Sequence, residues 1–142
     1  EIVVGRPAVE AAAKQPVTML PYSDVLRDLY GNALATSATI ARTNPGLVRR
    51  FRDATLRGVE WTIQNPEEAG RIMARHNPAY KEEVATAEVR QTVTYVRGSA
   101  PRIGHLDESR MARSIAVVQG IGLIKSGITP DRFAALDLAP TG

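Results

Sequence analysis

NPGLVRRFRDATLRGVEWTI, residues 44–63, is the stretch that decides the fold of this chain. It opens on Asn44-Pro45, and asparagine favours the helix N-cap while proline favours the first helical position. At about 100° per residue, its apolar side chains fall on one side of a helix and most of its charged side chains on the other. We therefore predict a surface helix with one buried face over these residues.

Two kinds of side chain on this helix could serve a functional site. Phe51 and Trp61 lie on the apolar stripe, so we interpret them as core residues rather than as the lining of a ligand site. Four arginines lie on the charged side: Arg49, Arg50, Arg52 and Arg57. They could form an anion-binding strip, but a solvated helix face explains them more simply.

Two further Asn-Pro steps follow. Asn65-Pro66 predicts the start of a second helix, with Glu68 placed to close a capping box and His76 near its end. Pro78 predicts a third helix that runs to Gly98, although the β-branched run at residues 92–96 could instead form a strand.

The C-terminal part carries similar signals. Asp107 predicts the cap of a fourth helix that continues until Gly127. The step Thr129-Pro130-Asp131 repeats the cap signal before a short last segment.

The N-terminal part has a different pattern. The aliphatic runs at residues 1–4 and 17–20 predict two short strands, and the alanine-rich residues 7–14 between them predict a helix. Residues 29–36 have no helical period, and we expect them to be extended or mixed.

Composition limits the class of protein. The chain has 142 residues, of which 44% are hydrophobic, which suffices for one domain with a core. It begins at Glu1 rather than at a methionine, so we expect it to be a piece of a longer protein. No apolar run approaches the roughly 20 residues of a membrane span, so we predict that it is not membrane-spanning.

Charge and cysteine content exclude further classes. The net charge is +3, but the basic residues are scattered and only 5% of the chain is aromatic, so we expect no nucleic-acid partner. The absence of cysteine excludes disulfides and thiolate metal sites and leaves the compartment open.

Residues that could carry catalysis are scarce. His76 and His105 have no cysteine or carboxylate at ligand spacing, which leaves zinc unsupported. Ser99 lies close in sequence to His105 and Asp107, but no nucleophile elbow surrounds it. We therefore predict no catalytic residue, no metal and no cofactor.

Three stretches together resemble the C-terminal part of the substrate-binding proteins of ABC importers: LYGNAL at residues 29–34, residues 44–61 of the stretch above, and NPEEAGRIM at residues 65–73. The branch to which the chain is similar handles thiamine-pyrimidine precursors, nitrate, sulfonates and taurine. The likeness extends from about residue 16 to residue 138, through a helix near residue 110, GLI at residues 122–124 and PDRF at residues 130–133.

The resemblance implies an α/β, two-lobed, periplasmic-binding-protein-like fold of type II, with the ligand between the lobes. Residues 1–142 would be a single, helix-rich C-terminal fragment of that fold. Residues 1–36 would form a β/α part of the second lobe and the crossing between the lobes, and residues 44–142 would form the C-terminal helices.

The implied function is that of the solute-binding component of an ABC import system. It would bind a small organic or anionic ligand and deliver it to an ABC permease. Its location would be periplasmic or extracytoplasmic, with a lipid anchor on the full-length protein as an alternative to a free form.

The resemblance also places the candidate ligand contacts near the crossing: Tyr22, Asp24, Tyr30 and Asn32. The tyrosines would stack on or border an organic ligand, and the polar pair would fix its orientation. Plain structural roles are the alternative, since Ser23-Asp24 is an ordinary turn and Tyr30 could simply pack.

Two other functions stay open. One is an enzyme on the same fold, because a relative of this family makes the thiamine pyrimidine and uses a cysteine-rich segment, although this chain has no cysteine. The other is a helical protein-interaction module whose surface arginines meet an acidic partner.

Overall fold

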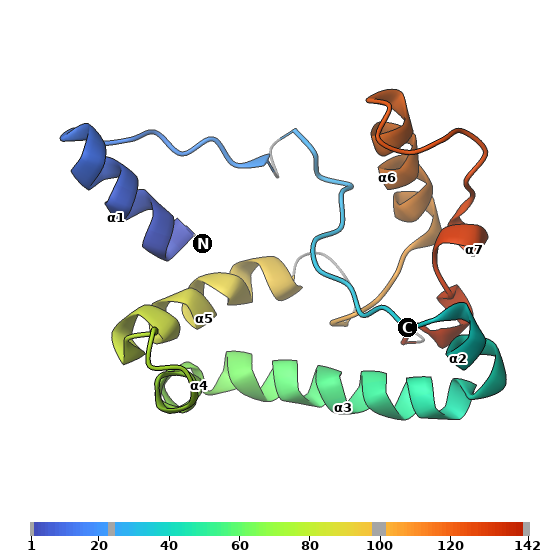
Figure 1. Cartoon of the computed structure of the whole chain (residues 1–142), viewed down its shortest axis with the longest axis horizontal. Coiled ribbons are helices and arrows are strands. Elements are labelled where there is room, and N and C mark those ends of the chain that lie inside the picture. The colour runs from blue at the N-terminus through green and yellow to red at the C-terminus, as the bar shows by residue number, and fades with distance from the viewer. Residues whose placement is uncertain (1, 23–24, 98–101, 141–142) are drawn as a thin grey trace. The chain divides into compact units, whose positions relative to one another are not determined.

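The computed structural model describes residues 2–22, 25–97 and 102–140 (Figure 1). The regular elements within these ranges are all helical. They are α1 (Ile2–Ala13), α2 (Ala38–Thr43), α3 (Pro45–Gln64), α4 (Pro66–His76), α5 (Glu82–Arg97), α6 (Glu108–Gly120), α7 (Pro130–Phe133) and the 3₁₀ turn η2 (Leu136–Leu138). The helix-rich character predicted for the chain is therefore confirmed.

The strand predictions are wrong within the described residues. Residues 2–4 belong to the first turn of α1, and residues 17–20 have no regular structure. Residues 92–96 lie inside α5, as the helix prediction for them has it, and the alternative of a strand there does not hold. A helix completes its hydrogen bonds within one segment, whereas a strand needs a paired neighbour. No described segment supplies such a neighbour, so the sheet of the predicted α/β class has no counterpart in this part of the chain.

The first Asn-Pro step starts a helix as predicted. Asn44 Oδ1 accepts a hydrogen bond from the Leu47 N–H at 3.1 Å, and α3 continues for 20 residues. Asn44 also ends α2, because its own N–H donates to the Ile40 carbonyl. One asparagine thus serves two consecutive helices.

The second step also starts a helix, but without the predicted capping box. The Asn65 N–H already donates to the carbonyls of Trp61 and Thr62 at the end of α3, so it is not free for Glu68. Glu68 instead accepts from Arg71 Nε at 2.9 Å. Pro66 occupies the first turn of α4, and the Asn65 side chain donates to the Trp61 carbonyl at 2.8 Å.

The third step does not start a helix. Asn77 ends α4, and its Oδ1 accepts from the Ala79 N–H at 3.2 Å within a turn. Helix α5 begins only at Glu82, four residues after Pro78. Asparagine side chains form such local turns readily, which competes with helix initiation.

The chain divides into two compact units. The first unit consists of residues 1–20 and 56–103, and its main feature is the packing of α4 against α5 (Figure 1). Gly70 is buried there. The two helices approach so closely that a Cβ at this position would lie 2.0 Å from Thr86 Oγ1 and 3.0 Å from the Glu82 carbonyl oxygen. Among the described residues of this unit, Ile63 and Ala85 are the buried hydrophobic ones.

The second unit consists of residues 21–55 and 104–142 and contains α6. Met111, Ile115 and Leu138 are buried in it. Helix α6 ends at Gly120 rather than at the predicted Gly127. Gly122 adopts a φ of +75°, and the following N–H reaches back to the helix, which is a common way to end one.

The predicted core positions of Phe51 and Trp61 are wrong. Their exposed fractions are 64% and 43%. The apolar stripe of α3 is present as predicted from the spacing, but it is largely open to solvent. Whether such a stripe is buried depends on neighbouring segments. The spacing of apolar residues within one helix carries no information about those segments.

Candidate functional site

The predicted ligand contacts lie in the second unit, on the segment before α2. The side chains of Tyr22 and Asn32 are exposed, and that of Tyr30 is half-buried. Asp24 lies outside the described residues. Three of the four predicted contacts can therefore be placed.

Tyr30 is tied to the start of α6. Asp107 caps this helix, with its Oδ1 accepting from the Arg110 N–H at 2.6 Å. The Tyr30 hydroxyl accepts from the Asp107 N–H at 3.0 Å and donates to the Asp107 carbonyl at 3.3 Å. The predicted cap is confirmed, and it doubles as the anchor of the candidate segment.

The side chain of Arg110 binds backbone carbonyls of the same segment. Its guanidinium carbon lies 4.2 Å from the centre of the Tyr30 ring, within the range of a cation–π contact. Its Nε donates to the Asp28 carbonyl at 3.1 Å, and its Nη2 donates to the Leu29 carbonyl at 3.0 Å. Nη2 also donates to the Arg27 carbonyl at 3.3 Å, so one arginine contacts the ring and three carbonyls of this segment.

Arg113 and Ser114 complete the attachment. Arg113 donates to both carboxylate oxygens of Asp28, at 2.9 and 3.0 Å, and the Ser114 hydroxyl donates to the Asp28 carbonyl. The hydrogen bond from Arg113 lowers the pKa of the Asp28 carboxyl below its usual value. We refer to Arg110, Arg113 and Ser114 as the α6 clamp.

A hollow of about 250 Å³ lies beside the clamped segment. Its lining consists of Val25, Leu26, Arg27, Asp28, Leu29 and Val117. Four of these residues are aliphatic, and the carboxylate of Asp28 is already engaged by Arg113. Tyr22, Tyr30 and Asn32 do not line this hollow, so the structure does not bring the predicted contacts together around it.

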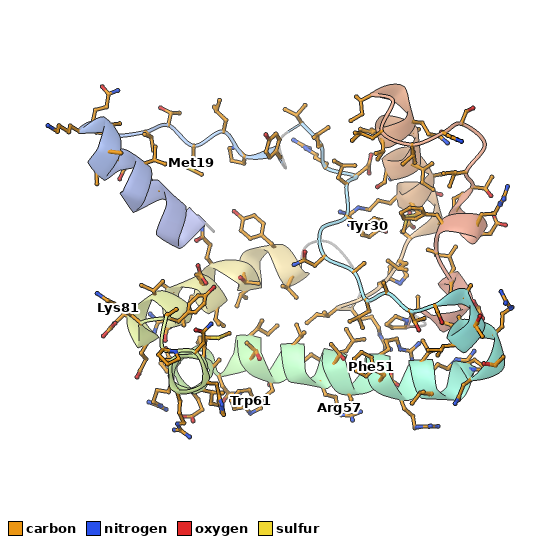
Figure 2. All side chains as sticks on the ribbon, viewed as in Figure 1. Met19, Tyr30, Phe51, Arg57, Trp61 and Lys81 are labelled. Carbon is orange, nitrogen blue, oxygen red and sulfur yellow. The ribbon has the colours of Figure 1, made fainter. Side chains whose placement is uncertain are left out.

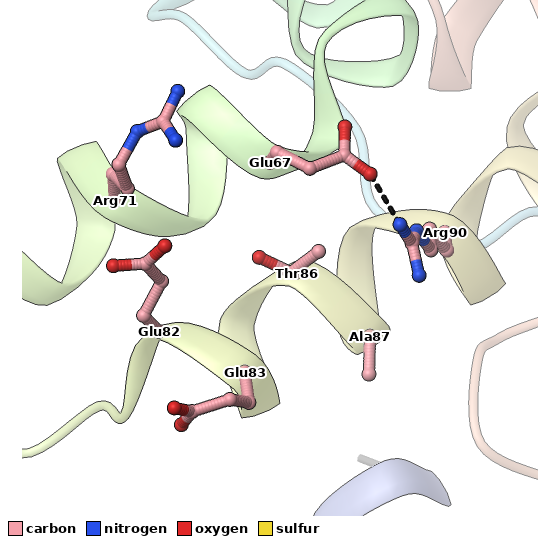
Figure 3. A pocket seen from close by; sticks show the side chains of 7 residues that line it. All are labelled: Glu67, Arg71, Glu82, Glu83, Thr86, Ala87 and Arg90. Atoms are coloured by element: carbon pink, nitrogen blue, oxygen red, sulfur yellow. Dashed lines mark hydrogen bonds and ion pairs between the residues drawn. The ribbon is translucent and has the colours of Figure 1, made fainter.

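A second hollow, of about 310 Å³, lies on the α4–α5 pair of the first unit (Figure 3). An ion pair between Glu67 and Arg90 joins the two helices at this place, and the hydrogen bond from Arg90 lowers the pKa of Glu67. Arg71, which also lines the hollow, pairs with Glu68. Both arginines of this hollow are therefore already engaged by carboxylates.

No three or more histidine, cysteine or acidic side chains gather among the described residues in a way that could hold a metal ion. None of the described helices combines the length and the apolar character that crossing a membrane requires.

Sequence reasoning missed the α6 clamp. Arg110 and Arg113 are three residues apart and so share one face of the helix, which was a usable signal. Their partners, however, are mainly backbone carbonyls about 80 residues away along the chain, and no side-chain pattern marks a carbonyl as a partner.

Comparison with known proteins gives one match. No curated protein and no solved structure is significantly similar to the chain. Residues 4–69, just under half of the chain, match the family described as NMT1/THI5 like. This segment includes all four predicted contacts and two of the three stretches on which the resemblance rests. Residues 4–69 are thus similar to the NMT1/THI5-like family, a family of ABC-transporter substrate-binding proteins, which agrees with the resemblance noted in the sequence.

Proposed function

We propose that the chain is part of the solute-binding component of an ABC import system, which binds a small organic or anionic ligand and delivers it to a permease. The observation that carries this proposal is the family match over residues 4–69. The matched segment spans the clamped residues and every predicted ligand contact. The family supports solute binding in general, and import through a permease is the finer part of the proposal.

The proposed mechanism is closure of two lobes around the ligand. A ligand that binds the closed form more tightly than the open form shifts the population toward the closed form. The permease would then recognise the closed, loaded protein. On this proposal the protein works outside the cytoplasm, in the periplasm or at the outer face of the membrane, either free or held by a lipid anchor.

The clamped segment would present the ligand contacts. Tyr22 and Asn32 have exposed side chains with hydrogen-bonding groups, so a ligand can reach them. Tyr30 is held by Asp107 and Arg110, so its ring loses less conformational entropy on binding than a free ring would. Asp24 remains a proposed contact from the sequence.

A ligand panel tests the proposal. We would measure the thermal stability of the protein that contains this chain with nitrate, taurine, an alkanesulfonate and a thiamine-pyrimidine precursor. At least one compound should raise the midpoint of unfolding, because binding to the native state alone stabilises it. Asn32→Ala should reduce that rise, whereas the matched control Thr36→Ala on the same exposed segment should keep it. No rise with any compound would contradict the proposal.

A further inference from the structure

The hydroxyl group of Tyr30 is occupied within the protein. It donates to the Asp107 carbonyl at 3.3 Å and accepts from the Asp107 N–H at 3.0 Å. A phenol has a single proton to donate. A ligand could therefore accept a hydrogen bond from this hydroxyl only after one bond to Asp107 had been broken. The ring, rather than the hydroxyl, is the part of Tyr30 that remains for a ligand.

One face of this ring, which is labelled in Figure 2, is occupied as well. The guanidinium carbon of Arg110 lies 4.2 Å from the centre of the Tyr30 ring. A planar guanidinium stacks well on an aromatic face, so this contact limits the orientations that the ring can take. A ligand can then use only the opposite face or the edge of the ring.

The guanidinium of Arg110 is itself engaged by the protein. Its Nε donates to the Asp28 carbonyl, and its Nη2 donates to the carbonyls of Arg27 and Leu29. These three carbonyls lie directly before Tyr30 along the chain. Arg110 therefore holds both the ring and the backbone that carries it, and these donors point at carbonyls rather than at a ligand.

Arg113 offers a comparison, because it binds the same segment at a different place. It lies three residues further along α6 and donates to both carboxylate oxygens of Asp28, at 2.9 and 3.0 Å. Among the described residues, no hydrogen bond or cation–π contact joins Arg113 to Tyr30. Both arginines attach the segment to α6, whereas the contact with the ring belongs to Arg110.

We propose that Arg110 is a positioning residue of the proposed solute site, which acts on the ligand through the ring of Tyr30. Tyr30 meets the ligand with the opposite face or the edge of its ring, and its hydroxyl joins the segment to α6. This inference rests on the proposed function, because it needs a ligand at residues 22–32. The residues that carry it all belong to the second unit.

Titration calorimetry on the protein that contains this chain tests the role of the ring. The probes are nitrate, taurine, an alkanesulfonate and a thiamine-pyrimidine precursor, and the compound that binds most tightly is used with every variant. Tyr30→Leu removes the ring and should weaken binding about tenfold. Tyr30→Phe keeps the ring and should weaken binding by less than about threefold, although it loses both hydrogen bonds to Asp107.

A double-mutant cycle tests whether Arg110 acts through the ring. Arg110→Gln should weaken binding about tenfold in wild type, but by less than about twofold when combined with Tyr30→Leu. Arg113→Gln is the matched control, because it should also lower the stability measured by urea unfolding, yet weaken binding by less than about threefold. If Arg110→Gln does not fold, Arg110→Lys keeps a cation at the ring without the guanidinium plane, and it should weaken binding about threefold.

The outcomes separate this inference from the proposed function. Absence of binding for all four compounds would overturn both. If a compound binds, three results would overturn the inference alone and leave solute binding intact. These are equal losses of affinity in Arg110→Gln and Arg113→Gln, additive losses when Arg110→Gln is combined with Tyr30→Leu, and a Tyr30→Leu variant that binds as tightly as Tyr30→Phe.

Discussion

The Tyr30 hydroxyl is hydrogen-bonded to both backbone groups of Asp107, to the N–H at 3.0 Å and to the carbonyl at 3.3 Å. The same aspartate caps α6 with its side chain. The segment that carries the predicted ligand contacts and the start of α6 are therefore joined at one residue. A substitution at either residue should therefore weaken the hydrogen bonds of the other.

The first prediction concerns the Tyr30 hydroxyl. Tyr30→Phe keeps the ring beneath Arg110 but removes both hydrogen bonds to Asp107, so the free energy of unfolding should fall by about 1 kcal/mol. Urea unfolding monitored by circular dichroism would measure it. Tyr95→Phe is the matched control, because Tyr95 is 56% exposed and its hydroxyl has no hydrogen bond to a described residue. Equal losses in the two variants would mean that the Tyr30 bonds contribute nothing.

The second prediction concerns the cap of α6. Asp107→Ala removes the acceptor of the Arg110 N–H and should lower the free energy of unfolding by about 1 kcal/mol. Asp107→Asn and Asp107→Ser keep an acceptor and should recover most of the loss. The midpoints of thermal unfolding of the three variants and of wild type would measure these differences. If asparagine and serine were as damaging as alanine, the cap would not be the cause.

The third prediction concerns pH. The pKa of Asp28 is lowered from 3.8 by its hydrogen bond with Arg113, so its ionised form stabilises the folded state. This stabilisation is fully present above pH 3.8 and is lost as the pH falls through the lower, folded-state pKa. Wild type should therefore be more stable than Asp28→Asn at about pH 6, and the difference should shrink toward about pH 2.

Urea unfolding of both proteins across this range of pH would measure the difference. Asp137→Asn is the control, because Asp137 is exposed and forms no ion pair with a described residue. A difference between wild type and Asp28→Asn that stayed constant with pH would show that the ion pair with Arg113 does not stabilise the fold.

The fourth prediction compares two glycines in helices. Gly70→Ala would place a Cβ against Thr86 Oγ1 and two backbone atoms of α5, so α4 and α5 must separate, at a cost of about 2 kcal/mol. Gly58→Ala meets open space and should stabilise α3 by about 1 kcal/mol through its better helix propensity. Midpoints of thermal unfolding should therefore move in opposite directions. A loss of stability in both variants would contradict the packing described for Gly70 and Gly58.

Signals that act within one turn of helix were readable in the sequence. Asn44 and Asp107 cap α3 and α6 as predicted, because a capping side chain and its N–H partner are three residues apart. The same rule fails at Asn65, because its side-chain amide donates to the Trp61 carbonyl of the preceding helix and forms no cap hydrogen bond with α4. Competition between two adjacent helices for one asparagine does not show in a local pattern.

Signals that depend on distant segments were not readable. The strands predicted at residues 1–4 and 17–20 needed a paired neighbour, and the described chain supplies none. Tyr30 was selected as a ligand contact by resemblance, whereas its attachment to Arg110 joins residues 80 positions apart. Phe51 and Trp61 were assigned to the correct stripe, but their exposure depends on what covers that stripe.

Isothermal titration calorimetry tests the central claim, solute binding, most directly. The protein that contains this chain would be titrated with the compound that raises its thermal stability most. We predict saturable binding with one ligand per protein, and an affinity that falls about tenfold or more in Tyr22→Ala and in Asn32→Ala but not in Thr36→Ala. Absence of heat for every compound of the panel, or equal affinity in all three variants, would contradict the claim or its placement on residues 22–32.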